Sequence, residues 1–339
     1  MLVFDIELAA PCNAKCDFCP QSFKPNGVKR KKKYLDEDLV VKIMNEIKEI
    51  SKKEEDGVIV DFCGMGENLL RKDLLLKSLE ILFSNENPNS KPPKLDIRLT
   101  TNGYYLTEDL VKNPLFQRIN QIEISIASTL NKEKYEAIYK INYDVVKKNV
   151  MNLKNYFQNK VVVAYVRVKQ LEEDEASFKK FWNPYVDEFL AHDFHNRGGA
   201  FEQSSISVEE YPDENRKFES CGIYYFFVFI SSEGNVLPCC NDVESKHPIG
   251  NVRDETLESI ITKKRKIQRA NSEGYDICIG CDGGDLMFMD NIPDEKKPQF
   301  DICGNCNDKC ETDLDLFVPT LLKDKKWNPV SYIRSKKNK

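Results

Sequence analysis

Six short apolar segments, rich in β-branched residues, alternate with helical patterns through the first 200 residues, and this alternation limits the possible folds most strongly. The apolar segments span residues 2–8, 58–63, 95–100, 121–126, 161–168 and 189–194. The helical patterns cover residues 36–53, 72–83, 107–113, 143–156 and 172–186. Strands separated by helices pair in parallel through right-handed crossovers. Six units are too few for a closed eight-stranded barrel, so the pattern predicts an α/β fold that is either an open doubly wound sheet or a partial barrel.

The alternation of strands and helices stops after Gly198 and Gly199. From about residue 202 the chain changes to short strands, turns and cysteines, which predicts a second, smaller unit that depends on metal for its stability. We therefore expect a barrel domain at 1–200, a cysteine-rich domain at 201–311, and a C-terminal extension with a basic tail at 312–339.

The overall charge argues against a nucleic-acid partner. The chain has 50 Lys and Arg residues and 55 Asp and Glu residues, so its net charge is -5. Binding of nucleic acid by general electrostatics needs an excess of positive charge. The longest apolar run, 223–230, is far shorter than the ~20 residues that cross a bilayer. The N-terminus also lacks a basic flank before an apolar signal core. We expect a cytoplasmic protein with no nucleic-acid partner and no membrane partner.

Three cysteines follow the first apolar segment at a spacing that suits an iron-sulfur cluster. Cys12, Cys16 and Cys19 form a CxxxCxxC loop. Three thiolates on one short loop can bind three irons of a four-iron cluster and leave the fourth iron without a protein ligand. Zinc is the alternative metal, but closed zinc sites usually show paired CxxC units.

This loop resembles the signature of radical S-adenosylmethionine (SAM) enzymes, including an aromatic residue, Phe18, before the third cysteine. The resemblance implies the partial (β/α)6 barrel of that superfamily and a 4Fe-4S cluster whose open iron is chelated by SAM. It also implies that the reduced cluster cleaves SAM to methionine and a 5'-deoxyadenosyl radical. A flavodoxin- or ferredoxin-type protein is the expected electron donor.

The turn after the second predicted strand resembles the GGEP motif of the same family. It reads Cys-Gly-Met-Gly-Glu-Asn over residues 63–68. Glycines allow the backbone to approach a ligand closely, and a carboxylate can accept an ammonium group. The resemblance assigns Gly64, Gly66 and Glu67 to the amino group of SAM, with Asn68 in the place of the usual proline.

Two further strand ends resemble SAM-contacting positions. Thr101 and Asn102 lie in a Thr-Asn-Gly turn that resembles the family's TNG motif, and Ser125 resembles its ribose- or carboxylate-contacting serine. Each could also be an ordinary turn residue that bonds its own backbone. Cys63 is interpreted as a buried strand cysteine outside every site, because free cysteine is commonly a small core residue.

Polar residues near the last predicted barrel strand are candidates for substrate contact. His192 and His195 are interpreted as structural histidines rather than general bases. Arg197 lies in an Asn-Arg-Gly-Gly turn that resembles a feature of this branch of the family. It is predicted as an active-site residue, because a fixed guanidinium suits an anionic or polar substrate.

Four later cysteines have the spacing of a fully ligated cluster: Cys221, Cys239, Cys278 and Cys281. Zinc could bind the same four thiolates. The segment around them resembles the auxiliary iron-sulfur module called SPASM, or its shortened form Twitch, which favours iron and sulfur. Gly234 is expected to allow a tight hairpin before Cys239.

The remaining cysteines leave two alternatives open. Cys240, Cys303, Cys306 and Cys310 either bind a second auxiliary cluster, or form a cysteine-rich loop beside a single one. Cys240 has a third possible role, as the thiol that donates a hydrogen atom to a substrate radical. A spare ligand or a packed thiol remains its simpler interpretation.

The resemblance implies an oxidoreductase in which the radical abstracts a substrate hydrogen atom and an auxiliary cluster accepts the remaining electron. The expected substrate is a peptide side chain, a polar sugar or an aminocyclitol. The chain enters the barrel at its second residue with no preceding leader-binding domain, which favours a small substrate or a leader held by another protein. The alternatives are a radical epimerase and a non-catalytic zinc-binding interaction protein.

Overall fold

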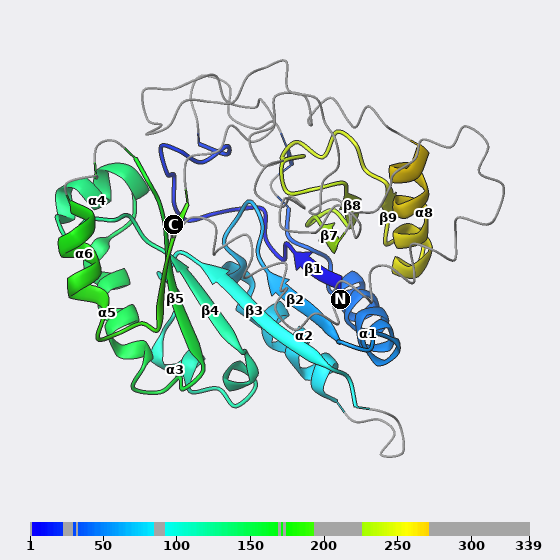
Figure 1. Cartoon of the computed structure of the whole chain (residues 1–339), viewed down its shortest axis with the longest axis horizontal. Coiled ribbons are helices and arrows are strands. Elements are labelled where there is room, and N and C mark those ends of the chain that lie inside the picture. The colour runs from blue at the N-terminus through cyan, green and yellow to red at the C-terminus, as the bar shows by residue number, and fades with distance from the viewer. Residues whose placement is uncertain are drawn as a thin grey trace, which may run out of the picture.

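In the part of the chain that the structure describes, one open sheet organises the fold, and helices cover one of its faces (Figure 1). The computed structural model describes residues 2–22, 30–31, 33–84, 92–168, 171, 174–192 and 226–270. The nine strands follow the order β6-β5-β4-β3-β2-β1-β7-β8-β9. The parallel strands are β1 (Leu2–Ile6), β2 (Val58–Phe62), β3 (Leu95–Thr101), β4 (Gln121–Ser125), β5 (Lys160–Val166), β6 (Glu188–His192) and β7 (Phe227–Ile230). The antiparallel strands are β8 (Asn235–Leu237) and β9 (Gly250–Asn251).

The strand order identifies the architecture as a partial barrel. From β1 to β6 each strand pairs with the next one in the chain, whereas a doubly wound sheet reverses its order at a switch point. The sheet does not close, because β6 and β9 lie at its two edges. The predicted (β/α)6 partial barrel is thus confirmed.

Helices connect these strands and supply half of the core. They are α1 (Glu37–Lys53), α2 (Lys72–Phe83), α3 (Glu108–Val111), α4 (Lys132–Tyr139), α5 (Tyr143–Leu153), α6 (Glu175–Trp182) and α8 (Leu257–Ala270), with 3-10 turns η1 (Asn68–Arg71) and η2 (Phe116–Arg118). In α1 the apolar residues recur at helical spacing, so that Ile43 and Ile47 are fully buried against Phe4 and Ile6 of β1.

The opposite face of the sheet carries polar residues. Successive strand residues point to opposite faces, so Asp5 points away from the helices that bury Phe4 and Ile6. The register places a row of side chains on neighbouring strands at this level: Asp5, Asp61, Arg98, Gln121 and Lys160. This polar face is therefore built by register, from residues that alternate with core residues in each strand.

The sequence pattern missed helix α4. Its eight residues are mostly polar, and only three of them are buried: Tyr135, Ile138 and Tyr139. The Asn131 side chain accepts a hydrogen bond from the Lys134 amide and begins the helix, and Lys140, with φ 57°, ends it. Short helices of this kind depend on caps and tertiary contacts more than on a long apolar stripe.

The strands that follow residue 225 join the barrel sheet rather than a separate one. β7 pairs in parallel with β1, so β1 is hydrogen-bonded on both sides. β8 and β9 then extend the sheet in antiparallel fashion. The carboxyl ends of β1 and β7 are consequently neighbours, with Ile6 opposite Ile230.

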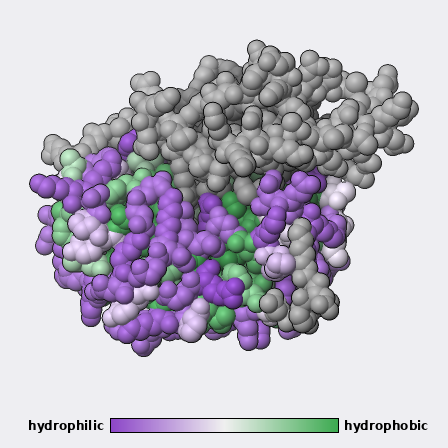
Figure 2. Space-filling view, turned by 60° about the horizontal axis from the view of Figure 1, so that its bottom comes forward, coloured by the Kyte–Doolittle hydropathy of each residue, from purple (hydrophilic) through white to green (hydrophobic). Residues whose placement is uncertain are grey.

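The described surface is predominantly polar. Figure 2 shows mostly hydrophilic side chains on the described part of the face in view. Among the described residues, Tyr34 is the one large hydrophobic side chain that is exposed. Within the same part of the chain, no helix has both the length and the apolar character needed to cross a membrane.

Candidate iron-sulfur and SAM site

The CxxxCxxC loop leaves the carboxyl end of β1 and is held by helix α4. The Lys15 amide donates to the Tyr139 carbonyl at 3.1 Å, and the Asp17 amide donates to the Ile138 carbonyl at 3.1 Å. The ring of Phe18 meets that of Tyr139 edge to face, with centroids 5.5 Å apart. The helix that the sequence pattern missed therefore supports the loop that the pattern identified.

The three thiols of this loop lie in an environment that favours their binding to a metal cluster. Cys12, Cys16 and Cys19 are half-buried. Burial raises the pKa of Cys12 to about 11 and raises the pKa of Cys16 well above its usual value, and neighbouring thiolate charge contributes to both shifts. Iron ions would offset this concentration of negative charge, because a coordinating thiol is deprotonated by the metal. The donor set thus fits the cluster that the loop spacing predicts.

The glycine turn, residues 64–66, packs directly against the segment that leads into the cysteine loop. A Cβ atom on Gly66 would lie 2.1 Å from the Ala9 carbonyl oxygen and 2.5 Å from that of Pro11. Only glycine allows this approach. The Gln21 side-chain amide donates to the carbonyls of Ala10 and Met65, at 2.7 and 2.6 Å. The turn and the loop therefore form one packed unit.

The carboxylate of Glu67 joins the ends of β2 and β3. The side chain is only 2% exposed. Oε1 accepts from the Leu69 amide at 3.0 Å and from the Thr101 hydroxyl at 2.9 Å, while Oε2 accepts from the Asn102 amide at 2.8 Å. Burial raises the pKa of Glu67, and these hydrogen bonds oppose the rise. Three bonds leave about one of the four acceptor positions of a carboxylate for a further donor.

Asn102 brings the end of β3 to the first cysteine. Its Nδ2 atom donates to Asn13 Oδ1 at 2.8 Å and lies 3.9 Å from Cys12 Sγ. Its Oδ1 atom accepts from the Tyr104 amide at 3.0 Å, and Gly103 between them has φ 79°. The Thr-Asn-Gly turn therefore lies beside the cluster loop.

Ser125 reaches the loop through an aromatic neighbour. Ser125 is the last residue of β4, and its hydroxyl lies 3.3 Å from the hydroxyl of Tyr139 in α4. The Tyr139 ring in turn contacts the ring of Phe18. The candidate SAM-binding residues thus lie along one edge of the sheet with the three cysteines. Their contacts with SAM itself stay a prediction.

Asn68 has a role that the motif comparison did not suggest. Its Oδ1 atom accepts from the amides of Leu8 and Ala9, at 2.8 and 3.2 Å, and its Nδ2 atom donates to the Ile6 carbonyl at 3.3 Å. Asn68 is 1% exposed. In place of the stiffness of a proline, this residue uses three hydrogen bonds to fix the backbone after β1.

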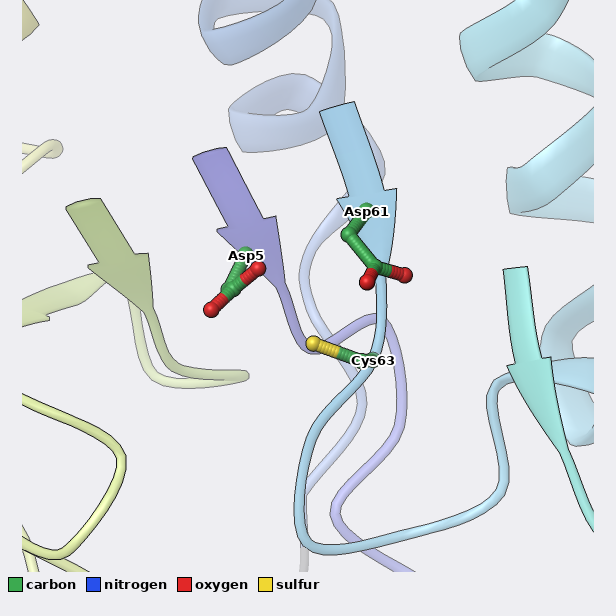
Figure 3. A group of neighbouring side chains, drawn as sticks. All are labelled: Asp5, Asp61 and Cys63. Carbon is green, nitrogen blue, oxygen red and sulfur yellow. The ribbon is translucent and has the colours of Figure 1, made fainter. Parts of the chain in front are cut away.

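A second polar cluster lies at the same edge of the sheet, where Asp5, Asp61 and Cys63 meet (Figure 3). One oxygen of each carboxylate and the Cys63 sulfur all lie within 4.8 Å of one another. Burial, and then the charge of Asp61, raises the pKa of Asp5. Burial also raises the pKa of the Cys63 thiol, and the charges of Asp5 and Cys240 add to the rise.

The location of Cys63 differs from the sequence interpretation. Cys63 is half-buried just after the end of β2 and its thiol points toward Asp5, whereas the sequence is interpreted as placing a buried cysteine within the strand. The available sequence signal was the pair of carboxylates, Asp5 and Asp61, inside otherwise apolar strands. Charged residues are seldom buried, so two carboxylates at matching positions of apolar strands are an informative signal.

The hairpin that precedes the later cysteines is formed as predicted. Gly234, with φ 80°, lies in the turn between β7 and β8, and Cys239 and Cys240 follow β8 half-buried. His192 ends strand β6. The other predicted residues lie outside the described residues: His195, Arg197, Cys221, Cys278, Cys281, Cys303, Cys306 and Cys310.

The chain belongs to the radical SAM superfamily. The model of that superfamily matches residues 6–181, which is just over half of the 339 residues. The model of the iron-sulfur cluster-binding domain SPASM matches residues 221–282. SAM, a 4Fe-4S cluster and auxiliary iron-sulfur binding therefore follow from family membership, and the protein is a radical SAM enzyme. No curated protein matches the sequence.

Solved structures with the same fold include enzymes that bind SAM. BtrN, in complex with AdoMet and 2-DOIA, is 20% identical, with a TM-score of 0.53 over 83% of this chain and 92% of that one. Native anSMEcpe with bound AdoMet is 15% identical, with a TM-score of 0.58 over 83% and 86%. Streptococcus suis SuiB, bound to precursor peptide SuiA, is 15% identical, with a TM-score of 0.55 over 84% and 72%.

Replacing Gly66 with alanine should weaken SAM binding, because the new Cβ must push the Ala9 carbonyl and with it the start of the cysteine loop. We expect Gly66→Ala to reduce SAM affinity at least about tenfold, since small displacements at such sites are costly. Equilibrium dialysis of SAM against the cluster-loaded protein measures this. Lys72→Ala, at an exposed position at the start of α2, should bind SAM normally. An unchanged affinity for Gly66→Ala would contradict the assignment of this turn.

Asn68→Ala should destabilise the fold, because the Leu8 and Ala9 amides lose their acceptor. We expect a loss of about 2 to 5 kcal/mol in the free energy of unfolding, since each buried unsatisfied amide costs about 1 to 3 kcal/mol. Asn68→Pro should behave alike, although proline is usual in the family motif. Anaerobic thermal unfolding of the cluster-loaded protein reports the loss. Asn152→Ala, exposed on α5, is the matched control and should unfold like the parent protein.

Proposed function

We propose that the chain is a radical SAM oxidoreductase that removes a hydrogen atom from its substrate and passes an electron to an auxiliary iron-sulfur cluster. One observation carries this proposal. The cysteine loop and the hairpin before Cys239 leave the carboxyl ends of β1 and β7, which are adjacent parallel strands. In α/β barrels this edge of the sheet is where active sites form.

The residues around the cysteine loop have separate roles in binding the clusters and SAM in this proposal. Cys12, Cys16 and Cys19 would hold the first cluster, and Cys239 is one ligand of the auxiliary cluster. When bound, the first cluster and SAM supply the radical that abstracts the hydrogen atom. The glycine turn and Glu67 would hold the amino group of SAM, and Asn102 and Ser125 would position the rest of the molecule. The reducing electron would come from a flavodoxin- or ferredoxin-type protein.

The polar face of the sheet supports a polar substrate. Asp5, Asp61 and Arg98 occupy neighbouring register positions there, and charged groups favour a polar ligand over an apolar one, since burial beneath an apolar ligand removes them from water. Among the structural neighbours, BtrN was solved with the small molecule 2-DOIA and SuiB with the peptide SuiA. The proposed substrate is accordingly a polar sugar, an aminocyclitol or a peptide side chain.

Anaerobic reconstitution tests the proposal. We expect iron and sulfide at about eight each or more per chain, as two or three four-iron clusters require, and cleavage of SAM to 5'-deoxyadenosine on reduction. Replacing Cys12, Cys16 and Cys19 together with alanine should remove about four irons and abolish the cleavage. Cys63→Ala should keep its full iron content. A colourless zinc protein that does not cleave SAM would instead support the non-catalytic alternative.

Radical epimerisation is the second candidate, and the location of Cys240 favours it. Cys240 is half-buried directly after Cys239, and its charge contributes to the raised pKa of Cys63, which lies on the polar face. In this reaction the Cys240 S–H bond breaks, and its hydrogen atom bonds to the substrate carbon radical. An auxiliary cluster bound at Cys239 would supply the one electron that, with one proton from solvent, converts the resulting thiyl radical back to the thiol.

Cys240→Ala separates the two reactions. An epimerase that loses its donor should stall or release a different product, while a dehydrogenase should keep its product. The reaction is run in D2O, because a thiol hydrogen exchanges with solvent. One deuterium per product molecule, lost in Cys240→Ala but kept in Cys63→Ala, would identify the epimerase and its donor. An oxidised product without deuterium in all three proteins would exclude it.

A further inference from the structure

We propose that Glu7 is a positioning residue that couples the glycine turn to the auxiliary hairpin, defined as residues 230–237. This inference rests on the proposed function, because it assumes that the glycine turn holds SAM and that the hairpin leads to an auxiliary cluster. Glu7 follows the end of β1 directly. It therefore lies between β2, which leads into the glycine turn, and β7, which leads into the hairpin.

The two carboxylate oxygens of Glu7 serve the two elements separately. Oε2 accepts from the Met65 amide at 2.9 Å, inside the glycine turn. Oε1 accepts from the Ser232 amide at 3.1 Å, inside the hairpin. The Glu7 amide also donates to the Ile230 carbonyl at 2.9 Å. One rigid group thus fixes the distance between two backbone segments that are far apart in the sequence.

Packing and charge both hold the Glu7 side chain in this position. Glu7 is 4% exposed, and a Cβ atom on Gly64 would lie 2.7 Å from its Cβ and Cγ atoms. The side chain therefore covers Gly64. Arg30 forms an ion pair with Oε1, and its Nη2 atom lies 3.4 Å from the Ser232 hydroxyl. Burial lowers the pKa of Arg30, and nearby acidic groups oppose that change.

These contacts explain why position 7 requires glutamate and why glutamine or aspartate would not replace it. Both partners of the carboxylate are N–H donors, and Arg30 is a third, so two acceptor oxygens are needed. Glutamine offers one oxygen and would turn its NH2 group toward a donor. Aspartate keeps the charge but is one methylene shorter, so it cannot reach Met65 and Ser232 together. We expect either change to separate the two elements.

The coupling has a measurable consequence that a purely structural role would lack. If SAM orders the glycine turn, the carboxylate transmits that order to the hairpin. SAM should therefore slow amide hydrogen exchange in both segments of the cluster-loaded chain, residues 60–68 and residues 230–237. In Glu7→Gln, SAM should still slow exchange in the first segment, at a higher SAM concentration, and should no longer slow it in the second.

Asp187→Asn is the matched control. Asp187 also accepts a backbone amide, that of Val161 at 2.7 Å, and pairs with Lys154, at the amino ends of β5 and β6. This variant should keep the SAM effect on both segments. If Glu7→Gln does not accumulate as folded protein, Glu7→Asp replaces it, with the same expected loss.

The outcomes distinguish the inference from the function on which it rests. A parent protein in which SAM protects neither segment would overturn the proposed function. Protection of residues 60–68 alone in the parent protein would overturn the coupling and leave the function in place. Protection of residues 230–237 that persists in the folded Glu7 variant would show that another contact carries the coupling, and it would overturn the role of Glu7.

Discussion

Two adjacent buried side chains after β2 fix the geometry on which the rest of the site depends. Glu67 binds the backbone at the end of β3, and Asn68 binds the backbone at the end of β1. Buried polar groups are costly unless they are satisfied, and in a low-dielectric interior their hydrogen bonds are correspondingly strong. The dipeptide therefore holds the ends of three neighbouring strands in one arrangement. The starting point of the cysteine loop and the position of Asn102 both follow from it.

The pairing of β7 with β1 is the second constraint on the site, because it sets where the hairpin lies relative to the cysteine loop. More than 200 residues separate these strands in the chain, yet they are adjacent in the sheet. Because the two strands are parallel, both end at the same edge of the sheet, where β1 leads to the cysteine loop and β7 leads to the hairpin turn. From that turn β8 runs back antiparallel to β7 and leads to Cys239. A separate cysteine-rich domain joined by a linker would not hold its cysteines in a defined place. Shared sheet hydrogen bonds give the two metal-binding segments a fixed relation.

The sequence predicted the features that local patterns encode. Strand and helix periodicity predicted an α/β fold with parallel strands, the spacing of Cys12, Cys16 and Cys19 indicated a metal-binding loop, and the family resemblance then favoured the partial barrel and the iron-sulfur cluster. It did not predict helix α4, whose polar composition hides its three buried residues, nor the bonds of Asn68 to residues about 60 positions earlier. Such contacts depend on which strands become neighbours. No pattern within a short segment contains that information.

The polar face also depends on which strands become neighbours, so short sequence patterns do not predict it. The residues on this face lower the stability of the fold. Register places Asp5 directly opposite Asp61, and like charges in such positions destabilise a sheet. Burial adds to this cost, as the raised pKa of Asp5 shows. Selection for stability alone would favour apolar residues at these positions, as in the layered core of a closed barrel. Local conflicts of this kind are expected where a fold must contact a ligand. This cost is the reason that the proposed function assigns the polar face, beside the cysteine loop, to substrate contact.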